Sequence, residues 1–242
     1  MRIPRFFESQ PLQTGADISL SDSVVQHVSR SLRMRPDDQI ILFNGDGSEH
    51  QAKLISIEKR SVTARIIEST PSSTESPLPI SIGQTLSRGE RMDYAVQKST
   101  EMGVKSITPL FSERCEVKLP KDRQEKRVKH WHQIAISACE QSGRTIPPEI
   151  AYPTDLEKWL ASQDAELKLV LHHHSEQPLQ KMSAPGSVAL LIGPEGGLTG
   201  EEVELATRYG FKPLTLGPRV MRTETAPVAA LTLLNYLWGD LA

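Results

Sequence analysis

The sequence predicts an α/β protein with a small, mostly β part at its N-terminal end. Two observations carry this prediction. A segment rich in proline, serine and threonine, STPSSTESPLP at 69–79, divides the chain. Before it, strand-like runs surround a glycine turn, whereas after it short apolar runs alternate with helical patterns. Alternation of strands and helices over a long stretch is typical of an open α/β sheet.

The composition is that of an ordinary globular protein. The 242 residues are 38% hydrophobic and carry a formal net charge of −2, which argues against disorder. No apolar run approaches the roughly 20 residues that cross a bilayer, and the N-terminal MRIPRFFESQ lacks the apolar core of a secretory signal. The two cysteines, Cys115 and Cys139, form no CxxC pair. We therefore expect a cytoplasmic protein.

The N-terminal part is expected to form a small β barrel or sandwich. Residues 22–34 predict a short helix, because Val24, Val28 and Leu32 recur at helical spacing. The run that follows, DQIILFNGDGSEHQAKLISIEKRSVTARIIES, is typical of strands. Its Asn-Gly-Asp-Gly at 44–47 supplies the positive φ angles that a tight hairpin requires.

The domain boundaries follow from this change of pattern. Residues 71–79 cannot pack a core, so they are predicted to be a linker. Residues 1–70 then form the β domain, and residues 80–242 form the larger α/β domain.

Five short apolar runs predict the strands of a parallel sheet in the larger domain. Their apolar residues are largely consecutive, which is typical of strands buried on both faces. The runs are 78–86, 105–111, 167–172, 187–193 and 212–217.

Three helical patterns lie between or after these runs. They cover residues 122–142, 199–209 and 224–238. The first has one apolar stripe, made of Val128, Trp131, Ala135 and Ala138. The second opens with Thr199 and Glu202 at the spacing of a capping box. The third has Pro227 in its first turn, where a missing N–H costs least.

A glycine-rich turn follows the fourth run, in LLIGPEGGLTGEEVELATRYG at 190–210. A dinucleotide-binding GxGxxG would open the first βα unit of its fold, and a phosphate loop would carry GxxxxGK[ST]; neither pattern stands here. Glu195 is expected to point its carboxylate toward the site, where it would repel a phosphate. A ligand with a cationic end and a neutral heterocycle fits better. The alternative is a turn whose glycines serve only the backbone angles.

Two further loops are expected to meet this turn. The next strand ends in LGPRVMRTETAP at 216–227, and the strand at 167–171 ends in LHHHSE. In an open α/β sheet, ligands bind at the carboxyl ends of neighbouring strands. The sequence therefore predicts a ligand site late in the chain, the reverse of the dinucleotide-binding order.

The pairing of IGPEGG with LGPRVMRTETA strongly resembles the RNA methyltransferases of the SPOUT superfamily, and within it the ribosomal RNA small subunit methyltransferase E family. Further matching segments are MRIPRFF, HVSRSLRMRPDDQIILFNGDG, KSTEMGVKSITPLFSERCEV and WHQIAISACEQSGRTIPP. The resemblance implies a deep trefoil knot in the C-terminal domain, a PUA-like RNA-binding N-terminal domain, and a homodimer. The apolar stripe of the last helix, Ala230, Leu233, Leu234 and Leu237, suits a dimer interface or, alternatively, ordinary core.

The same resemblance implies that S-adenosylmethionine lies bent in the knot and is held mainly by loop backbone, for which glycine allows close approach. The residues implied to bind it are Leu171, His172, Ile192, Gly193, Pro194, Glu195, Gly196, Leu216, Gly217, Arg222 and Thr223.

The family methylates N3 of a uridine in 16S ribosomal RNA. That nitrogen carries a proton at neutral pH, so the proton must leave and the anionic ring must be stabilised. An arginine aimed at the uracil carbonyls would do this; Arg222 is the first candidate and Arg219 the second. The alternative for Arg222 is a clamp on backbone carbonyls. Glu224 or Glu195 could be the base, and the sequence selects neither.

Charged residues are unevenly distributed along the chain, so a net charge close to zero is compatible with an RNA partner. Residues 86–130 carry 11 Lys/Arg and 7 Asp/Glu, whereas residues 149–210 carry 4 and 10. A local basic face can collect phosphates, although solvated helix faces are the alternative. The residues expected to bind RNA are Arg2, Arg5, Arg30, Arg33, Arg88, Arg91, Lys98, Arg114 and Arg144.

The sequence also offers a metal site and a noncatalytic function as alternatives. The consecutive His172–His174 suggest a metal, but adjacent residues on an extended chain point to opposite faces and no cysteine or HExxH lies nearby, so no metal is expected. A noncatalytic RNA-binding ribosome-assembly factor on the same fold is the alternative function. It need not keep a cofactor pocket, so intact GPEGG and RTETA segments favour the enzyme.

Overall fold

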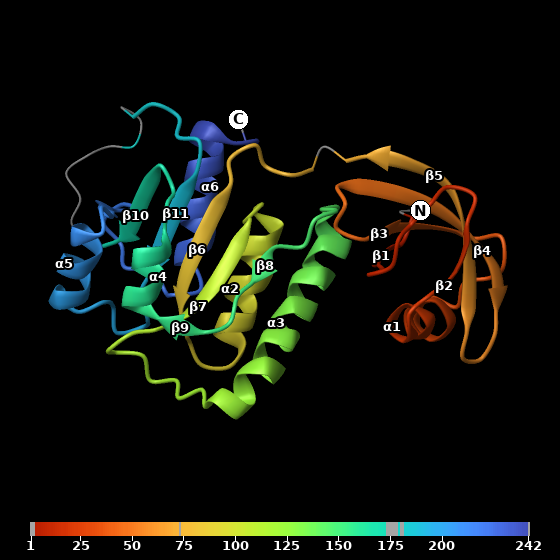
Figure 1. Cartoon of the computed structure of the whole chain (residues 1–242), viewed down its shortest axis with the longest axis horizontal. Helices are drawn as coiled ribbons and strands as arrows, with labels where there is room; N and C mark the ends of the chain where they lie inside the picture. The colour runs from red at the N-terminus through yellow and green to blue at the C-terminus, as the bar shows by residue number, and fades with distance from the viewer. Residues whose placement is uncertain (1–2, 73, 173–178, 180–181, 242) are drawn as a thin grey trace. The chain divides into compact units, whose positions relative to one another are not determined.

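The computed structural model describes residues 3–72, 74–172, 179 and 182–241. The chain forms two compact units. Unit 1 consists of Met1–Glu75 and Cys139–Pro147, and unit 2 consists of Ser76–Ala138 and Pro148–Ala242. Figure 1 colours the chain from red at the N-terminus to blue at the C-terminus, so unit 1 is mainly red and orange. The return of residues 139–147 to unit 1 has no counterpart in the sequence analysis.

Within the described residues, unit 1 is built on a five-stranded sheet of order β1-β3-β4-β5-β2. The strands are β1 (Arg5–Phe7), β2 (Asp17–Ser19), β3 (Gln39–Phe43), β4 (Ser48–Ile57) and β5 (Val62–Pro71). Strands β3 and β4 pair antiparallel on either side of the predicted turn. There, Gly45 and Gly47 have φ angles of 92° and 86°, which glycine adopts without steric cost. The hairpin prediction is confirmed.

One short helical segment packs against this sheet. Helix α1 (Asp22–Gln26) continues into a π-helical turn, η1 (His27–Ser31). Val24 and Val28 are buried in the core of unit 1, as their spacing predicts. The helical segment ends at Ser31 rather than at the predicted residue 34, and Leu32 is 50% exposed. It lies beyond the last helical turn, where helical spacing no longer aims side chains at the core.

Two buried arginines attach the returning segment to the rest of unit 1. The guanidinium of Arg5 pairs with Glu49 and donates to the carbonyl oxygen of Gly143 at 3.0 Å. Arg144, only 4% exposed, donates to the carboxylate of Glu75 at 2.6 Å. Removing one partner of a buried pair leaves a charge without compensation. The Arg5–Gly143 hydrogen bond and the Arg144–Glu75 pair therefore join residues 139–147 to the rest of unit 1.

Unit 2 is built, within the described residues, on a seven-stranded sheet of order β12-β10-β11-β6-β7-β8, with β9 also beside β7. The strands are β6 (Ile80–Thr85), β7 (Ser106–Phe111), β8 (Glu149–Ile150), β9 (Thr154–Asp155), β10 (Leu167–Leu171), β11 (Val188–Ile192) and β12 (Lys212–Leu214). Every pairing is parallel. The five apolar runs of the sequence each contain one of these strands, and the predicted parallel sheet is confirmed.

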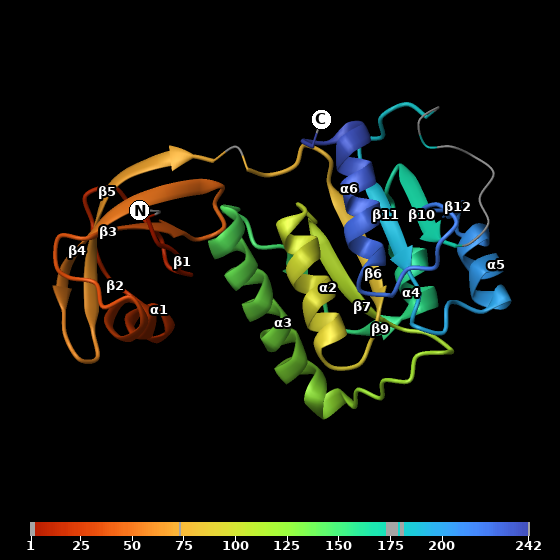
Figure 2. The same ribbon diagram turned by 180° about the vertical axis from the view of Figure 1, so that it is seen from behind.

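Helices cover both faces of this sheet. They are α2 (Glu90–Glu101), α3 (Lys121–Ser142), α4 (Leu156–Ser162), α5 (Gly200–Arg208) and α6 (Ala226–Trp238). Figure 2 shows α2 and α6 in front of the strands. Leu190 of β11 packs in one cluster with residues of α2, α3 and α6, whereas Leu191 packs in another with residues of α4 and α5. Successive side chains of a strand face opposite ways, which explains the uninterrupted apolar run.

The helix predictions hold in most of their details. The hydroxyl of Thr199 accepts from the backbone N–H of Glu202 at 3.2 Å, and the Glu202 carboxylate accepts from the Thr199 N–H at 2.9 Å. This reciprocal pair is the predicted capping box of α5. Pro227 lies in the first turn of α6, as expected. Helices α2 and α4 were not predicted.

The apolar stripe of α6 divides between core and surface. Ala230 and Leu234 are fully buried in the core of unit 2, whereas Leu233 and Leu237 are only partly buried against it. Tyr236 on the same helix is 60% exposed. The core alternative is thus correct for Ala230 and Leu234. In the part of the chain that the structure describes, no helix is both long and apolar enough to cross a membrane.

Candidate functional site

A pocket of about 230 Å³ lies where strands β10, β11 and β12 end. These three strands are neighbours in the sheet, in the order β12-β10-β11. Because all run parallel, their carboxyl ends share one edge. Leu171 and His172 at the end of β10 line the pocket together with the loops after β11 and β12. Within the described residues, the predicted convergence of these three strand ends late in the chain is confirmed.

The pocket lining contains most of the residues that were expected to bind a cofactor. Leu171, His172, Ile192, Gly193, Pro194, Glu195, Gly196, Leu216, Gly217 and Thr223 all line it. Arg222 is exposed and is not in the lining, whereas Arg219 of the same loop is. Lining residues that the sequence analysis did not assign to the cofactor are Arg114, Gly197, Leu198, Leu214, Thr215, Val220, Met221 and Ala226.

The GPEGG turn after β11 is folded tightly on itself. The N–H of Gly197 donates to the carbonyl oxygen of Pro194 at 2.9 Å, and Gly197 has a φ of 69°. A Cβ atom added at Gly193 would lie 3.0 Å from Leu198 Cγ and 3.1 Å from its backbone nitrogen. Glycine is therefore required here both for a backbone angle and for close approach.

The carboxylate of Glu195 is held by an arginine of α2. Arg91 Nη1 donates to Glu195 Oε1 at 2.8 Å. Partial burial acts to raise the pKa of Glu195, but hydrogen bonds from its own backbone N–H, from Arg91 and from the Arg88 N–H outweigh it and lower the pKa. Glu195 lines the pocket as expected, but its charge is already compensated within the protein.

Strand β6 supplies a polar support that the sequence analysis missed. Gln84, 1% exposed, donates from Nε2 to Thr223 Oγ1 at 3.0 Å. The Thr223 hydroxyl in turn donates to the carbonyl oxygen of Gly193 at 2.9 Å. Beside it, the Thr85 hydroxyl donates to the carbonyl oxygen of Ile192 at 2.8 Å. The last two residues of β6 thus hold both the turn after β11 and the loop before α6.

The loop between β12 and α6 is anchored at both ends. At its start, Thr215 donates its hydroxyl to the carbonyl oxygen of His172 at 2.9 Å, which joins it to the end of β10. Gly217 has a φ of 80°. At its end, the carbonyl oxygen of Arg222 accepts from the N–H groups of Thr225 and Ala226 at 2.9 Å and 3.0 Å. The main chain of Arg222 therefore forms a turn that leads into α6, while its side chain is exposed.

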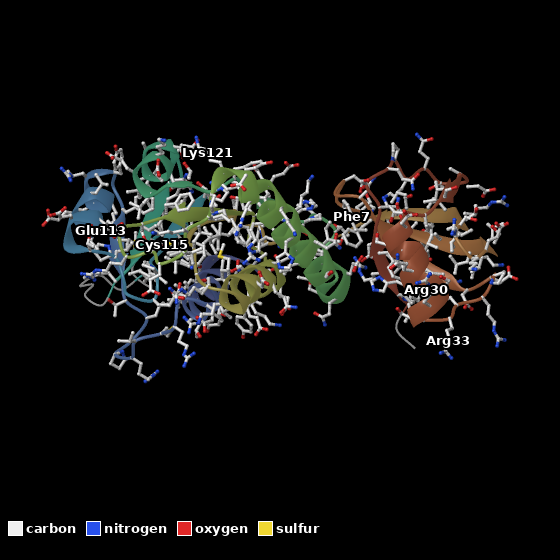
Figure 3. All side chains as sticks on the ribbon, turned by 90° about the horizontal axis from the view of Figure 1, so that it is seen from below. Phe7, Arg30, Arg33, Glu113, Cys115 and Lys121 are labelled. Carbon is white, nitrogen blue, oxygen red and sulfur yellow. The ribbon has the colours of Figure 1, made fainter. Side chains whose placement is uncertain are left out.

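The basic residues expected to bind RNA fall into different environments. Arg30 and Arg33 are exposed in unit 1, and Figure 3 labels both beside the helical segment. Arg5 and Arg144 are instead buried and paired with carboxylates. We correct the expectation for these two, because guanidinium groups enclosed in the interior cannot reach a phosphate. Arg2 lies outside the described residues.

The basic residues of unit 2 have protein partners. Arg88 pairs with Glu116 at 3.0 Å, Arg91 with Glu195, and Lys98 with Glu101 at 2.8 Å. Arg114 lies between Glu113 and Cys115, which Figure 3 labels. It donates to the carbonyl oxygen of Gly196 at 3.0 Å and so belongs to the pocket. Exposed ion pairs are weak, so these pairings leave an RNA contact open.

The sequence analysis expected no metal ion at the three consecutive histidines, His172–His174. Among the residues that the structure describes, no group of three or more His, Cys, Asp or Glu side chains is arranged to hold a metal ion. His172 lines the pocket. His173 and His174 lie outside the described residues.

A parallel α/β sheet with its pocket built at the ends of its last strands, together with a small β domain, is the arrangement expected of an RNA methyltransferase of the SPOUT type. An RNA methyltransferase domain family matches residues 74–235, and an RNA methyltransferase PUA domain family matches residues 20–67. The expected fold class is confirmed.

Full-length relatives define the family more narrowly. The chain is 36% identical over 241 residues to the ribosomal RNA small subunit methyltransferase E of Buchnera aphidicola subsp. Acyrthosiphon pisum, covering 99% of this chain and 95% of the relative. It is 32% identical to the protein of the same name from Bacillus subtilis, covering 94% and 93%. The chain belongs to the ribosomal RNA small subunit methyltransferase E family.

Two solved structures resemble the whole chain. A methyltransferase from Legionella pneumophila, in complex with bound S-adenosylmethionine, has a TM-score of 0.96 and 43% identity, with 100% of both chains covered. A ribosomal RNA small subunit methyltransferase E from Neisseria gonorrhoeae, bound to S-adenosylmethionine, has a TM-score of 0.94 and 40% identity, again with 100% of both chains covered.

Proposed function

We propose that this protein uses S-adenosylmethionine to methylate N3 of a specific uridine in the 16S ribosomal RNA of the small ribosomal subunit. The observation that carries the proposal is the pocket at the ends of β10, β11 and β12, lined by the glycine turns that the sequence singles out. Membership of the family, and the S-adenosylmethionine bound to two of its structural relatives, support the choice of cofactor.

The chemistry of the pocket fits this cofactor. Apolar side chains such as Leu171, Ile192 and Leu216 line it together with glycine backbone, which suits a neutral heterocycle. The close contact that a Cβ at Gly193 would make with Leu198 shows how little room the turn leaves for a side chain. When bound, S-adenosylmethionine supplies a methyl group on a cationic sulfur. The chain's part is to hold it, chiefly with the backbone of the GPEGG turn and of the 215–223 loop.

Two arginines of the last loop receive different proposed roles. Arg219 lines the pocket, so we assign it to the cofactor side. Arg222 is exposed outside the lining, where an incoming RNA can meet it. A guanidinium near the uracil carbonyls would stabilise the anion that forms when N3 loses its proton. Arg222 remains the proposed catalytic arginine.

The RNA is proposed to be held by exposed basic residues of both units. Arg30 and Arg33 of unit 1 are exposed, as are Arg88, Arg91 and Arg114 of unit 2. Aromatic residues make up only 5% of the chain, so phosphate contacts rather than base stacking are expected to dominate. A ribosomal substrate would place the protein in the cytoplasm.

A homodimer is proposed through the exposed side of α6. Leu233 and Leu237 are only partly buried within the chain, and Tyr236 is 60% exposed. A second copy of this helix would cover them. Analytical ultracentrifugation of wild type and of Tyr236→Glu tests this. A dimer that the substitution dissociates supports the proposal, and a wild-type monomer refutes it.

Methylation of the substrate itself tests the function. Small subunits purified from cells that lack this protein would be incubated with the protein and S-adenosylmethionine, and the modified base mapped by mass spectrometry of RNA fragments. We expect one methyl group, on N3 of one uridine of the 16S RNA. Methylation of a different base or ring position would refute the specificity. Absence of any methyl transfer, to subunits and free 16S RNA alike, would favour a noncatalytic assembly factor.

A further inference from the structure

Glu224 has a buried carboxylate oxygen for which the protein provides no donor. Among the described residues, Glu224 Oε2 is enclosed and makes no hydrogen bond. Burying a polar atom without a partner is costly, and native proteins rarely tolerate it without a reason. The missing partner of a carboxylate oxygen is an N–H or O–H group. Glu224 therefore lies ready to accept a proton or a hydrogen bond from something that binds.

The neighbours of Glu224 place it beside the pocket. The preceding residue, Thr223, lines the pocket and is fixed by its bond from Gln84. The negative charge of Glu224 also acts on Arg91 of α2. The pKa of Arg91 is raised, first by its hydrogen bond to Glu195 and then by the charges of Glu195, Glu224 and Glu116. Glu224 is not itself in the pocket lining, but it follows the lining residue Thr223 and acts on Arg91, the partner of the lining residue Glu195, within unit 2.

Two serines without partners lie at the same edge of the sheet. Ser87 Oγ and Ser112 Oγ are buried and, among the described residues, make no hydrogen bond. Ser87 follows β6 and Ser112 follows β7, and these strands are parallel neighbours with Thr85 beside Leu110. Hydroxyl groups can donate to carbonyl oxygens. These hydroxyls are two further polar atoms at this edge of the sheet for which the described residues provide no partner.

The other candidate base is already engaged. Glu195 accepts hydrogen bonds from the side chain of Arg91 and from the backbone of Arg88, and these lower its pKa. A carboxylate stabilised in its ionised form is a poor proton acceptor. Glu224 makes no such bond among the described residues. The structure therefore separates two glutamates that the sequence left equivalent.

We propose that Glu224 is the general base of the methyl transfer, an inference that rests on the function proposed above. The N3–H proton of the uridine passes to the carboxylate of Glu224. The N3 electron pair forms the new bond to the methyl carbon as the carbon–sulfur bond breaks, and the pair from that bond stays on sulfur as a neutral thioether. Glu224 then releases the proton to solvent. Charge balances, because one carboxylate and one sulfonium are consumed together.

The test compares Glu224→Gln with Glu116→Gln. Both changes replace a glutamate by its neutral isostere, and Glu116 is an exposed partner of Arg88 that faces the same arginines. Turnover is measured on small subunits, and S-adenosylmethionine affinity is measured separately by calorimetry. We expect Glu224→Gln to lower kcat about 100- to 10,000-fold, with cofactor affinity within about threefold of wild type. We expect Glu116→Gln to match wild type.

The pH profile distinguishes a base from a structural residue. Without the carboxylate, transfer needs a uridine that has already lost its proton, so the rate of Glu224→Gln should rise about tenfold per pH unit near neutrality. Wild type should respond much less over the same range. The charged groups around Glu224 are Arg91 of α2, Glu195 of the turn and Glu116 after β7 with its partner Arg88, and all four are unchanged in the variant.

A substrate whose N3–H is more acidic should partly restore the activity of Glu224→Gln. Subunits with a 5-fluorouridine at the target, whose N3 loses its proton more easily, should restore Glu224→Gln more than they accelerate wild type. Near wild-type turnover of Glu224→Gln would overturn the inference. So would a loss of cofactor affinity that accounts for the whole defect. If wild type itself methylates nothing, the proposed function fails first and the inference with it.

Discussion

The Thr223 hydroxyl donates to the carbonyl oxygen of Gly193 at 2.9 Å and accepts from Gln84 Nε2 at 3.0 Å. One side chain therefore joins the turn after β11 to the loop before α6. Thr223 and Gln84 are 4% and 1% exposed, so water does not compete for these bonds. Two walls of the pocket are held at a fixed separation by a residue that itself lines it.

Thr223→Val is expected to weaken cofactor binding. Valine keeps the shape of threonine but cannot donate to Gly193 or accept from Gln84, and a buried group left unpaired costs about 1–3 kcal/mol. Because Thr223 sets the separation of two pocket walls, part of this cost is expected to appear as a loss of S-adenosylmethionine affinity, at most roughly 150-fold, measured by calorimetry. Thr223→Ser, which keeps the hydroxyl, is the control and should retain most of the affinity. Equal affinities for the valine and serine variants would show that the bond does not shape the pocket.

The Arg91–Glu195 pair predicts a dependence of stability on pH. The pKa of Glu195 in the folded chain lies below its ordinary value of 4.5. The pair therefore adds stability above that pH, and the contribution disappears as the pH falls through the lowered value. Thermal unfolding of wild type and Arg91→Gln should differ slightly near pH 7 and converge once the pH has fallen below the lowered pKa of Glu195. A gap between the two proteins that widens in acid would contradict this assignment.

Alanine substitutions of Arg219 and Arg222 are expected to affect different properties of the enzyme, cofactor affinity for Arg219 and kcat for Arg222. Arg219 lines the pocket, so Arg219→Ala is expected to weaken S-adenosylmethionine binding. Arg222→Ala is expected to lower kcat by about 100-fold or more, the usual effect of removing one group that stabilises a developing anion, with little change in cofactor affinity. Steady-state kinetics together with calorimetry separate the two effects. Near wild-type turnover of Arg222→Ala would remove it from the mechanism.

RNA affinity should depend steeply on salt. Each phosphate contact contributes roughly 0.7 to 0.9 to the slope of log affinity against log salt. The double change Arg30→Gln and Arg33→Gln should therefore reduce the magnitude of the slope by roughly 1.5, measured by fluorescence anisotropy at several salt concentrations. Arg65→Gln is the control, because Arg65 is an exposed arginine of the same unit that is not among the residues proposed to bind RNA. A slope that none of these changes alters would exclude this basic surface.

Much of the fold could be predicted because its signals are local. Strand β11 is buried along its whole length, so its apolar run is visible without any partner. The capping box of α5 and the glycine turn at 44–47 are equally local. Helix α2 was missed because its buried side includes Ser99 and Thr100, which do not form an apolar stripe. Helix α4 has only 7 residues, too few for a clear periodicity.

The loops that line the pocket could be predicted from the sequence, but the side chains that hold those loops in place could not. Glycine turns at strand ends can be found in the sequence, which is why Gly193 and Gly217 were identified. The contacts of Gln84 with Thr223 and of Arg91 with Glu195 join residues more than 100 positions apart, and no local pattern connects them. One signal was available: Gln84 and Thr85 are polar residues at the end of an apolar strand. Such residues tend to be buried only when they have a bonding role.

Arg5 and Arg144 were predicted to bind RNA, but both side chains are buried in ion pairs. Arginines near an RNA-binding domain suggest phosphate contacts, but sequence alone does not show which of them meet a carboxylate inside the unit. Glu49 and Glu75 take these two. Only Arg30 and Arg33 of the described arginines proposed for unit 1 remain exposed.

A crystal structure of the protein grown with S-adenosylmethionine tests the central claim most directly. The account predicts density for one cofactor molecule in the pocket, between the backbone of Gly193 and that of Gly217, with Thr223 still bonded to Gly193. Cofactor density at another place in the chain, or an empty pocket at saturating cofactor, would contradict it.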